Sequence, residues 1–228
     1  MQAIVFMERN KQKDSIYFHS QATLKIVASA FILALCLIFN FIGSRIFIFP
    51  LANFLKFDIT IFFITIIFIY IGWNYGLSTG FLMLWIGPLL SSHGYELIAI
   101  LGHLILFFAQ MTFGFVFLVF QKTKIKSNFF KVVCTSLITI GFLLIFNIFL
   151  STPLYFRLYG DVSIGSFLDL ARSWNNYKLL FLDIPNYYLA TITIYFLFNL
   201  INLSINSFFL LLFLRYNARG LIFKNLKT

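Results

Sequence analysis

Residues Tyr95–Phe120 have the sequence YELIAILGHLILFFAQMTFGFVFLVF, in which Glu96 is the single charged side chain. One helix needs roughly 20 apolar residues to cross the hydrocarbon of a bilayer, so this stretch is long enough to span it. Over the whole chain Phe occurs 33 times and charged residues make up only 11%, a composition that soluble cores of this length do not have. The sequence therefore predicts an integral membrane protein.

Five further apolar runs extend this prediction to an all-α membrane protein, a bundle of six membrane-spanning helices. Helix is favoured for every run, because in lipid only a helix satisfies its backbone hydrogen bonds without a partner strand. We expect residues 1–228 to form a single domain, with basic segments at 1–22 and 216–228. The six predicted spans are Thr23–Gly43, Asp58–Gly72, Gly76–Ser91, Tyr95–Phe120, Phe129–Ser151 and Tyr187–Arg215.

The basic residues predict the orientation of this bundle. The net charge is +10, which in a soluble protein would suggest a nucleic-acid partner. Six spans, however, place the N-terminal segment, the connection between the fourth and fifth spans and the C-terminal tail on one side. Twelve Lys and Arg residues then lie on that side and five on the other. The positive-inside rule places both termini in the cytoplasm of a cell whose plasma membrane the chain spans, and no nucleic-acid partner is expected.

Six short motifs follow one another along the predicted spans. They are AFILA (30–34), FLKFD (54–58), GLSTG (76–80), GYEL (94–97), NIFLSTPLY (147–155) and FNLIN (198–202). In this order they resemble the AxxxA, FLKLD, GPxxG, GELxN, NYxxxxPLY and FNLIK motifs of the substrate-binding S components of energy-coupling factor (ECF) vitamin transporters. The riboflavin-specific type is the most similar.

This resemblance implies a function, a set of partners and part of a binding site. The chain would bind riboflavin as transported ligand from outside, need no cofactor, and deliver the vitamin with an ECF module of one transmembrane coupling subunit and two ATPases. Ala30 and Ala34 would dock the coupling subunit. Asn147 and Asn199 match the family asparagines that face the polar edge of the flavin, whereas Asn202 replaces the family lysine. An amide has a donor and an acceptor but no charge, so ligand identity could differ.

The residues themselves also predict a site. Polar groups within membrane spans usually face the bundle interior or a cavity, and here they gather in the outer halves of the spans. A largely apolar cavity with a few directed polar groups is typical of a small-molecule site. The candidate ligand-binding residues are Leu55, Lys56, Asp58, Glu96, Asn147, Tyr155, Asn199 and Asn202.

Structural roles are open for several of these residues. The asparagines could form hydrogen bonds between helices, and Lys56 could pair with Asp58. The stripe of Ala30 and Ala34 could pack inside the bundle. His103 is expected to be an interior residue with its hydrogen bonds satisfied.

The stretch Ser151–Asn186 is the one long connection, and it contains Pro153 and Pro185. An ordered connection of this length is often a lid over a site, and the alternative is a flexible surface loop. Arg172-Ser173-Trp174 could be an anchor of this segment at the membrane interface, because Trp favours the headgroup zone.

Enzymatic function is not expected. The sequence has no HExxH or DxD motif, and its Ser91-Ser92-His93 cluster lies in a short turn without a GxSxG elbow. It has no Walker motif either, so ATP hydrolysis would belong to partner subunits. The alternatives to a riboflavin S component are an S component for another vitamin such as folate, and a small-molecule membrane transporter outside the ECF family.

Overall fold

The computed structural model describes residues 2–91, 94–161 and 163–217, with side chains described from residue 21 onward. Within these ranges the protein is helical and contains no strand, which confirms the predicted all-α fold. The helices are α1 (Gln2–Ile46), α2 (Thr60–Tyr70), α3 (Trp73–Ile86), η1 (Gly87–Leu90), α4 (Leu97–Gln121), α5 (Asn128–Phe146), η2 (Asn147–Ser151), α6 (Thr152–Leu158), α7 (Phe167–Arg172), η3 (Trp174–Asn176), η4 (Lys178–Phe181) and α8 (Tyr187–Asn217).

Four helical stretches of the described chain are long and apolar enough to cross a membrane. They are Gln21–Ile46, Leu97–Gln121, Asn128–Leu158 and Tyr187–Asn217. They correspond to the first, fourth, fifth and sixth predicted spans. The protein is therefore membrane-embedded by the length and composition of these helices.

The second and third predicted spans form helices that are shorter than a full span. α2 has 11 residues and α3 has 14. At about 1.5 Å per residue these lengths give about 16 Å and 21 Å, against a hydrocarbon core of roughly 30 Å. Gly72, with a φ of 141°, lies in the tight turn that joins the two helices. The six-span count thus stays a prediction.

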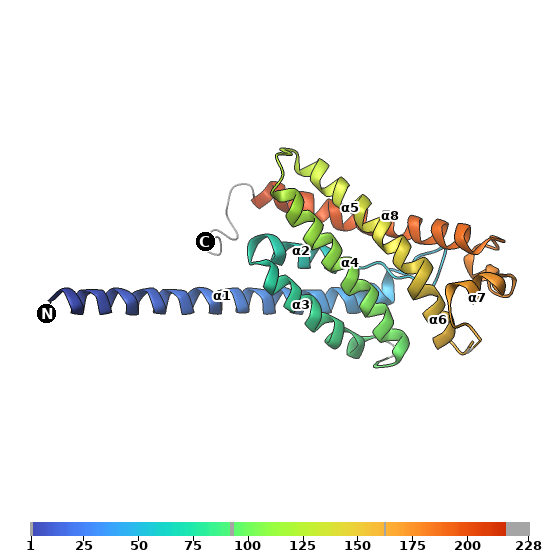
Figure 1. Cartoon of the computed structure of the whole chain (residues 1–228), viewed down its shortest axis with the longest axis horizontal. Coiled ribbons are helices and arrows are strands. Elements are labelled where there is room, and N and C mark those ends of the chain that lie inside the picture. The colour runs from blue at the N-terminus through green and yellow to red at the C-terminus, as the bar shows by residue number, and fades with distance from the viewer. Residues whose placement is uncertain (1, 92–93, 162, 218–228) are drawn as a thin grey trace.

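The first helix is longer than predicted. α1 begins at Gln2 and continues without interruption to Ile46, so the basic N-terminal segment extends the membrane helix beyond the bundle (Figure 1). The absence of Pro and Gly before Gly43 explains why nothing ends the helix earlier. A Cβ at Gly43 would lie 2.9 Å from the Phe57 carbonyl oxygen, so glycine lets the next segment pack onto α1.

Three described parts of the chain next to or within its basic segments lie at one end of the molecule. The start of α1, the 122–127 connection between α4 and α5, and the end of α8 lie on the left of Figure 1. The 47–59 connection, α6 and α7 lie at the opposite end, which we call the distal end. This arrangement agrees with the charge distribution that the sequence predicts between the two sides.

Two clusters of buried side chains hold the bundle together. The larger one joins α1, α2, α3, α4, α5 and α8 around Ile64, Phe113 and Leu210. The second joins the 47–59 connection, the short distal helices and the first half of α8 around Phe49, Phe181 and Ile194. The space between these clusters contains the candidate site.

Candidate functional site: a distal cavity

A cavity of about 380 Å³ opens in the distal half of the bundle, between α1, the 47–59 connection, α4, α5, α6 and α8. Small-molecule sites have volumes of about 300 to 1,000 Å³, so the cavity can hold a ligand of vitamin size. Seven of the eight predicted ligand-binding residues line it: Leu55, Lys56, Asp58, Asn147, Tyr155, Asn199 and Asn202.

Glu96 is the predicted site residue that does not line this cavity. It is exposed at the N-cap of α4, where its carbonyl accepts the hydrogen bond from the Ile100 N–H. Ile98 and Ala99, in the next turn of the same helix, do line the cavity. Glu96 is thus at the rim, and its contact with a ligand stays a prediction.

A π-helical turn positions Asn147 in the wall. In η2 the Thr152 N–H donates to the Asn147 carbonyl, five residues earlier. Pro153 has no N–H to continue the α-helical ladder, which favours this wider turn, and π-turns are common at functional sites. The Asn147 side chain is buried, and its Oδ1 accepts a hydrogen bond from Ser151 Oγ.

Asn199 on α8 carries an unsatisfied donor. The residue is 4% exposed, and its Nδ2 is buried without a hydrogen-bond partner among the described residues. Buried polar atoms in folded proteins almost always have a partner, and leaving one unmade costs roughly 1–3 kcal/mol. Since Asn199 lines the cavity, a ligand acceptor in the cavity would satisfy this group.

Asp58 is the centre of the polar network in the cavity wall. Its carboxylate accepts hydrogen bonds from Asn40 Nδ2 at 2.9 Å and from the Thr60 N–H at 2.7 Å, and also from the Thr60 hydroxyl. The alternative that Lys56 pairs with Asp58 is not seen among the described residues, because Asn40 and Thr60 donate to the carboxylate instead.

The backbone of Asp58 is held by α8. Asn202 Oδ1 accepts from the Asp58 N–H at 2.9 Å, and Asn206 Nδ2 donates to the Asp58 carbonyl at 2.7 Å. A lysine at position 202 could not make the first bond, because an ammonium has no acceptor. The departure of Asn202 from the motif of the similar family therefore has a structural role in this chain.

Lys56 lines the cavity as a half-buried cation. It forms no ion pair with any described residue. A cation in this position favours a ligand that presents carbonyl or carboxylate oxygens.

Tyr155 reaches the cavity from α6. A Cβ at Gly102 of α4 would lie 3.1 Å from the Tyr155 hydroxyl, so the glycine leaves room for this side chain. Tyr155 and Asn147 thus enter the cavity from the two sides of the π-helical turn.

Five residues of the polar network were not among the predicted ligand-binding residues. They are Asn40, Thr60, His103, Gln110 and Asn206. His103 is buried and hydrogen-bonded, as predicted for an interior residue. Asn40, Gln110 and Asn206 are amides within apolar runs, the same signal that identified Asn199, so the sequence pattern could have found them.

The long distal connection is packed as an ordered cap. Its described residues include the short helices α7, η3 and η4, and the Phe181 ring lies 5.5 Å from the ring of Phe54, a cavity-lining residue. This contact packs the cap against the 47–59 connection, and its role as a lid stays a prediction.

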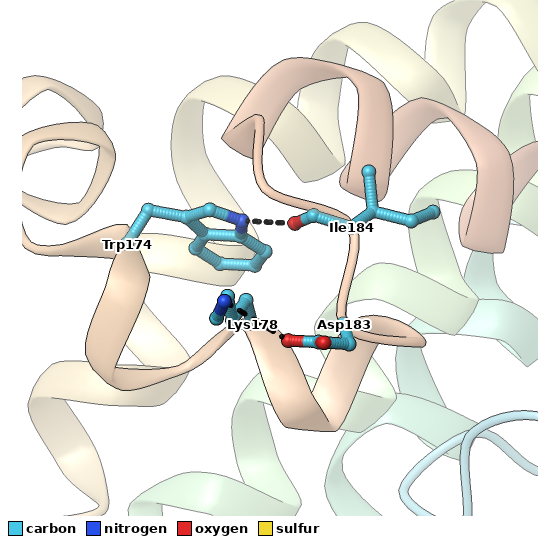
Figure 2. A network of polar contacts seen from close by, with 4 residues as sticks. All are labelled: Trp174, Lys178, Asp183 and Ile184. Carbon is cyan, nitrogen blue, oxygen red and sulfur yellow. Dashed lines mark hydrogen bonds and ion pairs between the residues drawn. The ribbon is translucent and has the colours of Figure 1, made fainter.

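Two polar contacts brace the cap internally (Figure 2). Trp174 Nε1 donates to the Ile184 carbonyl at 2.8 Å, and Lys178 Nζ lies 3.2 Å from Asp183 Oδ1. The interfacial anchoring predicted for Trp174 is wrong: the residue is 2% exposed, because its ring packs against Phe181 and Tyr187.

The small-residue stripe of α1 faces outward. Ala30 and Ala34 are exposed, whereas Ser29, Ile32 and Cys36 face the bundle. The alternative that this stripe packs inside the bundle is therefore wrong.

No protein-family model matches the chain, and no curated protein matches it. The resemblance to S components therefore rests on the six short motifs alone.

Proposed function

We propose that the protein is the substrate-binding S component of an ECF-type vitamin importer. It binds riboflavin in the distal cavity from outside the cell, and a transmembrane coupling subunit with two ATPases drives delivery. In this proposal the chain is a capture subunit and not an enzyme. α2 and α3 complete six membrane passes, and both termini are cytoplasmic in the plasma membrane.

The observation that carries the proposal is the buried Asn199 Nδ2, which has no partner among the described residues and lies in the wall of a cavity of vitamin size. The flavin ring has carbonyl oxygens along one edge, which are the acceptors that this donor lacks. Lys56 adds a second donor to the same cavity, and the aromatic and aliphatic wall suits the apolar face of the ring.

The proposed topology is supported by the separation of charge and cavity. The basic 122–127 connection lies at the end of the bundle opposite α6 and α7 (Figure 1), whereas the 47–59 connection and α6 of the distal end line the cavity. By the positive-inside rule the basic end is cytoplasmic, which leaves the cavity at the outer side, where an importer meets its substrate.

The first prediction is that the purified protein in detergent binds riboflavin with a submicromolar Kd. The measurement is quenching of flavin fluorescence on titration with protein, because a ring buried among aromatic side chains and amides loses its emission. Folate, biotin and thiamine serve as competitors. Tight binding of one of these without riboflavin would overturn the ligand assignment but leave a vitamin-binding function.

The second prediction concerns Asn199→Leu. The substitution should weaken riboflavin binding by about 1–3 kcal/mol, or roughly 5-fold to 150-fold in Kd, because a ring oxygen loses its donor. Thermal stability without ligand should change little, since Nδ2 has no hydrogen bond to lose within the described part of the chain. Unchanged affinity in this variant would mean that Asn199 does not contact the ligand.

A carboxylated vitamin such as folate is the second candidate, and one observation favours it. Lys56 is a cation in the cavity wall without an ion pair among the described residues. Lys56→Met should weaken binding of a carboxylated ligand more than binding of riboflavin, which the same competition titration measures.

A further inference from the structure

Three side chains in the cavity wall form a continuous hydrogen-bonded chain from α4 through α1 to the 47–59 connection. His103 Nδ1 lies 2.9 Å from the Ala99 carbonyl oxygen, and His103 Nε2 lies 3.3 Å from Asn40 Oδ1. The other end of the same amide, Asn40 Nδ2, lies 2.9 Å from Asp58 Oδ2. All three residues line the cavity.

The three side chains can satisfy all of these contacts only if they hold one proton in addition to the hydrogen on His103 Nδ1. The Ala99 carbonyl is an acceptor, so His103 Nδ1 must carry a hydrogen. If the Asn40 oxygen faces the ring, Nε2 must carry a hydrogen too. His103 is then an imidazolium, and the Asn40 amide donates to an ionised Asp58.

Reversing the Asn40 amide, so that its nitrogen faces His103, requires the same number of protons. Its nitrogen then donates to a neutral His103 Nε2, and its oxygen needs a donor from Asp58. Asp58 must therefore carry the hydrogen on Oδ2. The two orientations of an amide are alternative assignments of one geometry, and both contain one proton and no net charge.

We propose that Asn40, Asp58 and His103 form a proton-binding site, in which one proton is shared between the Asp58 carboxyl and the His103 imidazole through the Asn40 amide. The proton belongs to the pair and not to either residue. Without it, either a lone pair of Nε2 faces an oxygen or the amide oxygen faces a carboxylate. In the first case the bond between Asn40 of α1 and His103 of α4 is lost, and in the second the bond between Asn40 and Asp58 is lost.

The other groups around the site are not expected to change their charge near neutral pH, so the shared proton is the one that titrates there. Thr60 and Gln110 extend the network from Asp58 but do not ionise. Lys56 lines the same cavity, and a lysine is ordinarily a cation throughout the neutral range. The remaining titratable neighbours are Tyr155, Tyr159 and Tyr195 in the cavity wall and Cys36 on α1, one turn before Asn40. Phenols and thiols ordinarily ionise only above about pH 8.

The proton makes folding stability depend on pH with a definite sign. In the unfolded chain the imidazole loses its proton near pH 6.5, whereas the folded chain keeps the shared proton to a higher pH. Above about pH 6.5 the folded state therefore binds more protons than the unfolded state, so stability falls as the pH rises.

The test compares the wild-type protein with Asp58→Asn in thermal unfolding from about pH 5 to about pH 8. The wild-type Tm should be constant to about pH 6.5 and then fall by about 3–5 °C per pH unit. The side-chain amide that Asp58→Asn introduces can donate permanently through the reversed Asn40 amide to a neutral His103. The Tm of Asp58→Asn should therefore rise up to about pH 6.5, where the unfolded imidazole is charged, and be constant above it.

A second variant disturbs the geometry and leaves every ionisable group in place. A Cβ at Gly87 would lie 2.5 Å from His103 Nε2, so Gly87→Ala must displace the ring from Asn40. This variant should lose the fall in Tm above pH 6.5. The unmodified site can also be followed directly by NMR in a His19→Gln, His93→Gln background, where His103 gives the ring ¹⁵N signals. These signals should not change between about pH 5 and about pH 7.5.

Two results would overturn the proposal. One is a His103 signal in the wild-type site that titrates near pH 6.5, as a solvated imidazole does. The other is the same pH profile of Tm in wild type and Asp58→Asn. Neither result bears on riboflavin binding at a fixed pH, so the proton site and the proposed ligand fail separately.

Discussion

Replacing both Ala30 and Ala34 with leucine is expected to abolish vitamin uptake and leave riboflavin binding intact. The two alanines lie four residues apart on one face of α1 and are exposed there. Small side chains on a membrane helix let a partner backbone approach closely, and leucine at both positions blocks that approach. Uptake by whole cells and co-purification of the coupling subunit measure the loss, while flavin quenching measures the retained binding.

Gly141→Leu is a matched control for this double variant. A Cβ at Gly141 of α5 would meet no atom of the described residues within 4 Å, so the control adds the same kind of bulk to another open helix surface. It should transport normally. Wild-type transport by the Ala30→Leu, Ala34→Leu variant would show that α1 does not dock the coupling subunit through this stripe.

Asn206→Leu should have the largest effect on stability. Asn206 is fully buried, its Nδ2 donates to the carbonyls of Asp58 and Asn202, and its Oδ1 accepts from the Phe62 N–H at 2.9 Å. The Phe62 N–H is one of the first-turn donors of α2 that have no partner within the helix, so α8 caps α2 through this side chain.

Leucine at position 206 would leave the Asp58 carbonyl and the Phe62 N–H without partners. At roughly 1–3 kcal/mol for each buried group, unfolding should become easier by about 2–6 kcal/mol. Thermal unfolding in detergent without ligand measures this change. Asn199→Leu, seven residues earlier on the same helix, is the control that should unfold almost as the wild type does. Equal unfolding temperatures for the two variants would contradict the distinction between a ligand donor and a structural amide.

The sequence was a good guide to which side chains face the interior. An amide or acid in an apolar run is unfavourable against lipid and therefore faces the bundle interior or a cavity. This explains why Asn147, Asn199 and Asn202 could be assigned to the cavity. The partner that each one bonds depends on how helices distant in sequence pack. For this reason the Asp58 carboxylate accepts from Asn40 and Thr60, and not from Lys56, and its backbone N–H donates to Asn202.

The sequence predicted the fold less completely where the length of a helix or a local interruption within it decides the geometry. An apolar run marks a membrane helix but not its depth. The runs 58–72 and 76–91 were already short for a span, and the helices that they form are shorter still, at 11 and 14 residues. Similarly, Pro153 signalled an interruption, while the π-helical turn that it favours, and the resulting position of Asn147, required the three-dimensional structure.

The bracing of the cap has a kinetic consequence. The Trp174–Ile184 hydrogen bond, the Lys178–Asp183 ion pair and the ring contacts of Phe181 join the segment into one body. Such a body opens by moving as a whole, with the Phe54–Phe181 contact among those that must break. Loosening it should therefore change the residence time of a molecule bound in the cavity more than the rate of its arrival.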